Sequence, residues 1–206
     1  MAQPTNTFDT YDSVGEREDL SDVIYSISPT DTPFISSAAK TKATAVLHEW
    51  QTDSLAAAVT NNAVIEGDEA TLDAVSATSR LSNSSQIMDK TVVITGTQES
   101  VDKAGRASEL AYQIAKKAKE LKRDMEATVT GNIAEETGGS STARKMGTLG
   151  SWIATNDVFG ASGASGSAGN TARTDGTQRA FTEAQLKSVI KSVWNEGGEP
   201  SMIMVG

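Results

Sequence analysis

One long amphipathic helix, predicted from Ser108 to Asn132, constrains the fold more than any other feature of the sequence. Ser108 suits the N-cap position, and Gly131 with Asn132 ends the pattern. A helix of this length spans roughly 35 Å. Its apolar stripe is narrow, which predicts a helix that lies across a sheet with its other faces in water. The stripe repeats at spacings of four and seven residues and consists of Leu110, Ile114, Leu121, Met125 and Val129.

The polar side of this helix is strongly basic, although the chain as a whole has a net charge of -9. Wrapping by nucleic acid depends on clustered Lys and Arg, so the overall charge argues against it and the helix is a local exception. The simplest interpretation of the basic residues is that they form a helix face exposed to water. The functional interpretation is that they form a surface that contacts another molecule. The basic residues are Lys116, Lys117, Lys119, Lys122 and Arg123.

Two strands are predicted on either side of a long acidic segment. The stretch TAVLHEWQTDSL from Thr44 alternates, with His48 and Trp50 on one face of a half-buried strand. The run SQIMDKTVVITGT from Ser85 is rich in β-branched residues and predicts the second strand. Their connection is far longer than a hairpin turn of two to five residues. We therefore expect an extended excursion between the two strands.

The excursion from Thr52 to Ser79 contains five carboxylates and neither Lys nor Arg. As two extended arms it would reach on the order of 45 Å at ~3.3 Å per residue. It has few large apolar residues, so it is expected to lie along another surface, with plain disorder as the alternative. Its acidic residues are Asp53, Glu66, Asp68, Glu69 and Asp73.

Proline, glycine and capping residues organise the two ends of the chain. A polar arm is followed by a predicted short helix with Leu20, Val23, Ile24 and Ile27 on one side, and Pro29 and Pro33 are expected to hold the chain extended after it. Near the other end, FGASGASGSAGN predicts a mobile loop or linker. A helix over 181–196 is predicted by the capping box of Thr182 and Gln185, and SMIMVG predicts the opening of a buried strand.

Residues suited to catalysis, cofactor binding or metal binding are scarce. The sequence has no cysteine, which fits a reducing compartment, and its single histidine, His48, has no sequence cue to a nucleophile. No phosphate-binding glycine motif occurs, and EGDEATLD lacks the ligand spacing of a calcium loop. No stretch approaches the ~18 apolar residues of a membrane span. We predict no catalytic, cofactor-binding or metal-binding residues, and a structural or binding role.

The order of these parts, together with EDLSDVIYSISPTDTPF and RKMGTLGSWI, resembles the major capsid proteins of tailed bacteriophages with the Hong Kong 97-type fold. The resemblance covers nearly the whole chain and implies an α+β fold with an N-terminal arm, an extended β-hairpin loop, a long spine helix on a β-sheet and a partial axial domain. The implied boundaries are 1–34 for the arm, 35–180 for the peripheral domain and 181–206 for the incomplete axial domain. The extended loop would occupy about 45–97 and the spine helix about 108–132.

The same resemblance implies a structural protein, not an enzyme, that assembles with itself into hexamers and pentamers of an icosahedral head shell. Scaffolding, portal and decoration proteins are the other implied partners, with double-stranded DNA held non-specifically at the inner face. The acidic loop would contact a neighbouring subunit, and the basic helix face would meet that loop or the DNA. The protein would be made in the bacterial cytoplasm and reside in the virion. The alternatives are a tail-associated or other oligomeric binding module, and a hydrolase that uses His48.

Overall fold

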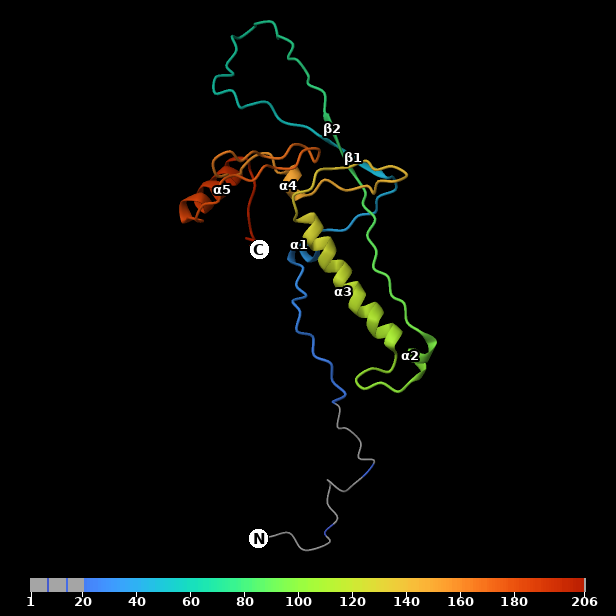
Figure 1. Cartoon of the computed structure of the whole chain (residues 1–206). Helices are drawn as coiled ribbons and strands as arrows, with labels where there is room; N and C mark the ends of the chain where they lie inside the picture. The colour runs from blue at the N-terminus through green and yellow to red at the C-terminus, as the bar shows by residue number, and fades with distance from the viewer. Residues whose placement is uncertain (1–6, 8–13, 15–20, 206) are drawn as a thin grey trace, which may run out of the picture. The chain divides into compact units, whose positions relative to one another are not determined.

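The structure is a computed structural model that describes residues 7, 14 and 21–205. It combines helices with one small antiparallel sheet, which confirms the α+β class (Figure 1). The chain divides into two compact units: one comprises residues 1–30 with Lys90–Glu120, the other Asp31–Asp89 with Leu121–Gly206. The elements are α1 (Pro33–Ser37), β1 (Leu47–Thr52), β2 (Ser79–Ser84), α2 (Gly96–Ser100), α3 (Glu109–Val129), α4 (Leu149–Trp152) and α5 (Glu183–Asn195).

The long helix is confirmed as α3, and its first turn is capped as the sequence predicts. The Ser108 hydroxyl oxygen accepts the Ala111 N–H at 3.1 Å, which satisfies one of the free donors of the first turn. The residues of the apolar stripe lie on α3 as predicted, but other parts of the chain leave their side chains largely open to solvent. Leu110 is 46% exposed and Ile114 is 55% exposed. Among the described residues, α3 therefore lacks the full layer that its stripe predicts.

The predicted strand from Thr44 is confirmed as β1, but the second strand lies earlier than predicted. In the antiparallel pair Leu47 faces Ser84 and Thr52 faces Ser79, so β2 ends where the predicted strand begins. The rings of His48 and Trp50 lie 5.9 Å apart, which confirms that they share a face. The β-branched run 91–95 has strand propensity, yet no described segment pairs with it, and propensity without a pairing partner forms no sheet.

The short helix predicted before Pro29 is wrong within the described residues 21–28, which are not helical. The helix forms instead at α1, where we expected an extended chain. Pro33 occupies the start of α1, a position that suits its fixed φ and missing N–H. The polar arm and Leu20 lie outside the described residues, apart from Thr7 and Val14.

The glycine- and serine-rich segment, predicted to be a mobile loop or linker, forms a loop whose backbone is paired. Ala164 bridges to Thr174 and Ser167 to Thr171 in antiparallel fashion, with the Ala164 N–H donating to the Thr174 carbonyl at 3.0 Å. Gly169 adopts a φ of 79° and its Cα faces Trp152 so closely that a Cβ would lie 2.8 Å from the ring. These glycines permit close packing of chain segments, which composition alone does not distinguish from flexibility.

The predicted helix near the other end is confirmed as α5, and the Gln185 side chain accepts the Thr182 N–H at 3.1 Å, as a capping box requires. The predicted buried strand after it is wrong for the described residues 201–205, which form no strand and are exposed. A strand needs a neighbour for its backbone groups, and no described segment supplies one.

Apolar burial is nearly absent from the part of the chain that the structure describes. No hydrophobic residue there is classed as buried, and the buried side chains are polar: Thr32, Ser84, Glu109, Thr148 and Ser151. Trp152 is half-buried, and Ile153 is 48% exposed. No helix among these residues is long and apolar enough to cross a lipid bilayer. Folded proteins normally hide most large apolar side chains, so these surfaces call for further partners.

Candidate functional site

The most prominent candidate surface is the loop 53–78, which leaves β1 and returns to β2 (Figure 1). Its five acidic residues are all exposed. One turn gives the loop a defined tip: the Asp68 N–H donates to the Ile65 carbonyl at 3.1 Å, and Gly67 has a φ of 84°. Positive φ at this position of a turn favours glycine. The turn places Glu66, Asp68 and Glu69 together at the tip.

The same loop also exposes apolar side chains. Leu55 is 98% exposed, Leu72 is 99% exposed and Val75 is 96% exposed. Each large aliphatic side chain gains about 1.5–3 kcal/mol when it leaves water. A loop that carries several such residues beside carboxylates is suited to lie against a surface that is both apolar and basic.

The base of the loop is held firmly by contacts within one unit. Trp50 of β1 lies 5.1 Å from Trp152 between ring centroids. The Asn83 side chain of β2 makes two hydrogen bonds with the Gly147 backbone, at 2.9 Å from its amide nitrogen and 2.8 Å to its oxygen. Across the strands, Glu49 pairs with Arg80 and raises the pKa of the guanidinium by hydrogen bonding and by charge. The strand pair is thus an anchored stalk for the loop.

A buried hydroxyl organises the segment against which this stalk rests. Thr148 is 1% exposed. Its Oγ1 donates to the Gly131 carbonyl at 2.8 Å and accepts the Ile133 N–H at 2.8 Å. Its backbone carbonyl accepts the Ser151 hydroxyl at 2.8 Å. Thr148 therefore ties the chain after α3 to the start of α4 through polar groups in place of an apolar core.

Glu126 of α3 anchors α1 in the same unit. Its two carboxylate oxygens accept the Phe34 N–H at 2.7 Å and the Ile35 N–H at 2.8 Å. Lys122, one turn earlier, donates to the Ser36 hydroxyl at 3.0 Å. A carboxylate at the first N–H groups of a helix is favourable both as a hydrogen-bond acceptor and as a negative charge near the positive end of the helix.

The predicted basic face of α3 is divided between engaged and available cations. Lys117 pairs with Glu120 at 2.6 Å, and this hydrogen bond is the main reason that the pKa of Glu120 is lowered. Lys122 is engaged with α1 as described above. Lys116, Lys119 and Arg123 are exposed, and no described carboxylate forms an ion pair with them. The face is therefore less uniformly available than the sequence predicts.

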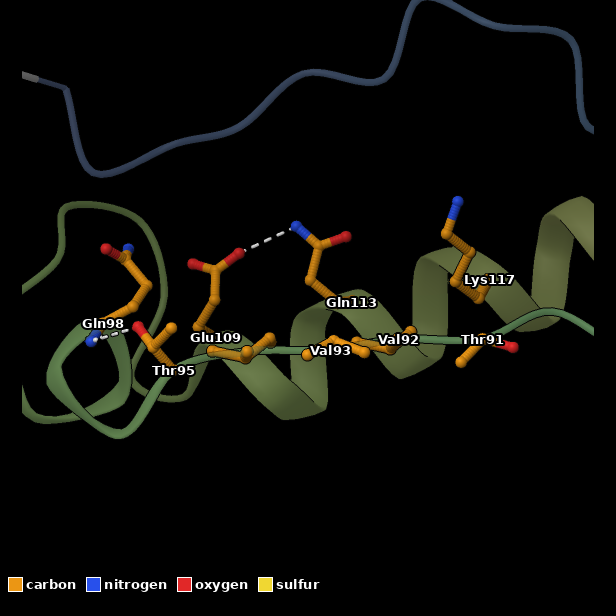
Figure 2. Close-up of a pocket in the computed structure, with 9 residues that line it drawn as sticks. Thr91, Val92, Val93, Thr95, Gln98, Glu109, Gln113 and Lys117 are labelled. Atoms are coloured by element: carbon orange, nitrogen blue, oxygen red, sulfur yellow. Dashed lines mark hydrogen bonds between the residues drawn. The ribbon is translucent and has the colours of Figure 1, made fainter.

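Sequence analysis missed a cluster of charged residues around the start of α3. Figure 2 shows the Glu109 carboxylate hydrogen-bonded to Gln113, in a hollow of about 550 Å³ that lies between the extended segment 91–95 and α3. Gln113 and then Arg106 lower the pKa of Glu109 by donating hydrogen bonds to it. Glu99, ten residues before α3, accepts the N–H groups of Glu109 and Leu110 at 3.0 and 3.1 Å. No sequence spacing predicts a cap from so far away.

The Glu99 cap predicts acid-sensitive order at the start of α3. The Ser108 hydroxyl and then the Leu110 N–H lower the pKa of Glu99. Because its pKa is lowered in the folded chain, the Glu99 carboxylate stabilises the fold at pH values above the ordinary glutamate pKa. This stabilisation is lost as the pH falls through the lowered pKa. We expect Glu99→Gln to speed amide exchange of the first turn of α3 at neutral pH, with a difference from wild type that shrinks as the pH falls through the lowered pKa of Glu99.

Hydrogen exchange resolved by mass spectrometry measures this effect. Glu183→Gln is the matched control, because Glu183 pairs with Lys187 on the exposed surface of α5 and should leave α3 unchanged. An equal difference between Glu99→Gln and wild type at every pH would rule out a charged Glu99 cap.

The described residues show no arrangement for catalysis or metal binding. His48 stands on β1 beside Trp50, and no serine or carboxylate among the described residues forms a hydrogen bond with it. No group of three or more His, Asp or Glu side chains in the described part of the chain is placed to hold a metal ion.

Comparisons with known proteins relate the chain to major capsid proteins of phages. Residues 3–206 match the family described as the SU10 major capsid protein. The major capsid protein of Escherichia phage Phieco32 is 40% identical over 126 residues, which cover 61% of this chain and 36% of that protein. The chain thus aligns with about a third of the length of this curated relative.

Proposed function

The chain belongs to the SU10 major capsid protein family, and from this premise we propose that it is a structural subunit of the shell that encloses a phage genome. The single observation that carries the proposal is the loop 53–78: an anchored strand pair supports a long segment whose acidic and apolar side chains are exposed. Such a segment is stabilised when it lies on another molecule. A shell of identical subunits offers every loop the same surface.

We further propose that the chain adopts the Hong Kong 97-type arrangement. In that arrangement residues 1–34 form the arm, 35–180 the peripheral domain with α3 as its spine, and 181–206 the beginning of the axial domain. The proposal is supported by the family match and by the order of the hairpin, the long helix and α5. Subunits would assemble into hexamers and pentamers of a closed shell. Scaffolding, portal and decoration proteins are the further partners that this arrangement proposes.

We propose that the protein acts by binding alone, as an assembling subunit. The exposed acids of the loop would contact a neighbouring subunit, and the available cations of α3 would face that neighbour or packaged DNA. Opposed charges of this kind steer association and fix its register more than they add affinity. The virion is accordingly the proposed location.

The available cations of α3 provide a salt-dependent test of this proposal. We expect particles of the triple variant Lys116→Ala, Lys119→Ala, Arg123→Ala to dissociate at a lower temperature than wild type, because attraction to an acidic surface is lost. The difference should shrink as ionic strength rises to about 1 M, where the screening length falls to about 3 Å. Thermal dissociation followed by light scattering at several salt concentrations measures it.

The matched control for this variant is Lys187→Ala on α5, whose pairing partner Glu183 lies on the same exposed helix face. It removes one surface cation and should leave dissociation unchanged. Comparison of empty with DNA-filled particles separates the two partners: an equal loss in both indicates protein, whereas a loss confined to filled particles indicates DNA. A triple variant that matches wild type at low salt would refute a role for these cations.

A further inference from the structure

One aspartate of the chain, Asp175, is followed directly by a glycine, in the loop between α4 and α5. The backbone nitrogen of the next residue can attack an aspartyl side chain, because the two groups close a five-membered ring. Glycine favours this reaction, since it has no Cβ to block the approach or to restrict the backbone. No asparagine of the sequence precedes a glycine. The pair Asp175–Gly176 is therefore the place in this sequence that is best suited to the reaction.

The structure leaves both reacting groups unprotected. The Asp175 side chain is 79% exposed, and its ion pair with Arg173 joins Oδ1 to Nε at 3.2 Å. An exposed pair of this kind holds a side chain only weakly. The Gly176 N–H donates to no acceptor among the described residues. Its nitrogen thus has no hydrogen bond to break before it approaches the carboxyl carbon.

The residues on either side of the pair are tied down. The Thr174 N–H donates to the Ala164 carbonyl at 2.9 Å, and the Thr177 N–H donates to the Ala161 carbonyl at 2.9 Å. The pair is consequently a short step without backbone hydrogen bonds of its own between two anchored positions. The anchors keep the loop ordered, and the step between them keeps the freedom that ring closure needs.

The exposed aspartates elsewhere in the described chain lack this combination. Asp68 is exposed, but the next residue is Glu69, whose side chain hinders the approach of its nitrogen. The Glu69 N–H also donates to the Asp68 Oδ1 at 3.0 Å. Asp53 is followed by Ser54 in the same way, with the N–H donating to Oδ1 at 2.9 Å. These two aspartates serve as internal references for Asp175.

We infer that Asp175–Gly176 is a site of spontaneous isoaspartate formation in the folded protein. The Gly176 nitrogen forms a bond to the Asp175 Cγ, and the N–H proton leaves with the carboxyl hydroxyl as one water molecule. The product is a succinimide ring, which a water molecule then opens. Cleavage between nitrogen and Cγ restores aspartate, whereas cleavage between nitrogen and the main-chain carbonyl carbon leaves the peptide link through Cγ. Water is the only co-reactant, and nothing is oxidised or reduced.

The isoaspartate is expected to open the loop, because it adds one methylene group to the main chain. Gly176 passes the backbone of Gly160 so closely that a Cβ added to Gly176 would lie 2.5 Å from the Gly160 carbonyl oxygen. An extra methylene therefore displaces one of the two segments. The hydrogen bonds that anchor Thr174 and Thr177 are the ones expected to break. Isomerisation would thus remove the backbone pairing of this glycine-rich loop.

Ageing of the full-length protein tests the inference. Folded protein is incubated for weeks beside a peptide of residues 171–179, which serves as the unstructured reference. An isoaspartyl methyltransferase with a labelled methyl donor counts the product, and fragmentation in a mass spectrometer locates it. We expect isoaspartate at position 175, formed at a rate within about tenfold of the peptide rate, which means a barrier raised by at most about 1.4 kcal/mol. Asp53 and Asp68 should remain aspartate.

Two substitutions sharpen the test. Asp175→Glu keeps a carboxylate near Arg173 but would have to close a larger ring, so it should form no isomer. Asp175→Asn undergoes the same attack with loss of ammonia, and the resulting change in mass reports directly whether the Gly176 nitrogen reaches Cγ. Hydrogen exchange of the segment 161–177 should become faster in aged wild type and stay constant in aged Asp175→Glu.

The outcomes separate the inference from the proposed function. Isoaspartate in the folded protein, with faster exchange around it, supports the inference. Isomerisation of the peptide alone, while the folded wild type and Asp175→Asn stay unmodified, overturns it, because the loop then holds the nitrogen away from Cγ. Unchanged exchange after isomerisation refutes the expected opening of the loop. None of these results depends on whether the protein forms shells.

Discussion

Replacing residues 53–78 of the full-length protein by an Asn-Gly turn is expected to abolish closed shells while leaving a folded subunit. Thr52 and Ser79 face each other in the strand pair, so a two-residue turn of this sequence closes the hairpin without shifting its register. The variant removes every acidic and apolar side chain of the loop but retains the anchored stalk. Subunits would then lose the surface that joins one copy to the next.

Two measurements separate lost assembly from lost folding in this variant. Negative-stain microscopy and sedimentation measure the fraction of protein in shells, which we expect to fall below detection. The fluorescence of Trp50 and Trp152, whose rings lie 5.1 Å apart at the base of the loop, reports whether the stalk is intact and should match wild type. A loop of equal length made of Gly and Ser is the matched control for length and should also fail to assemble. Shells of the shortened variant at wild-type yield would exclude the loop from assembly.

Thr148→Val is expected to destabilise the subunit by about 1–3 kcal/mol, a large effect for a change that conserves shape. Valine cannot accept the Ile133 N–H or donate to the Gly131 carbonyl, each 2.8 Å from Oγ1. The Ile133 N–H would lose its acceptor, whereas the Gly131 carbonyl would keep the Gly150 N–H, which donates to it at 3.0 Å. Because the described chain has no buried apolar residue, polar ties such as this one carry an unusual share of its local order.

Denaturant unfolding followed by tryptophan fluorescence measures the loss, since Trp152 lies in the adjacent α4. Thr148→Ser retains the hydroxyl and should restore most of the stability. Thr155→Val makes the same chemical change at an exposed position and should be nearly neutral. Equal stability of the Thr148→Val and Thr155→Val variants would show that the buried hydroxyl contributes nothing.

The parts of the fold that the sequence predicts well are those decided by neighbouring residues. The stripe and cap of α3, and the capping box of α5, depend on contacts three to seven residues apart, and both helices are confirmed. The first strand was also predicted, because alternation is a local pattern.

The parts that the sequence does not predict are decided by distant contacts. β2 is placed by its pairing with β1. The β-branched run 91–95 has a more typical strand sequence than β2, but no described segment pairs with it. α1 forms where Glu126, more than ninety residues away, accepts its first N–H groups. The glycine-rich loop is ordered because its glycines admit close packing against Trp152. Which cations of the basic face are engaged and which are available depends on the partners that they meet in the folded chain.

Negative-stain microscopy of the full-length protein, expressed with and without a co-produced scaffolding protein, tests the central claim most directly. The proposed function predicts uniform closed shells in at least one of these conditions. Only small discrete oligomers under every condition would contradict it and would favour a tail-associated or other binding module.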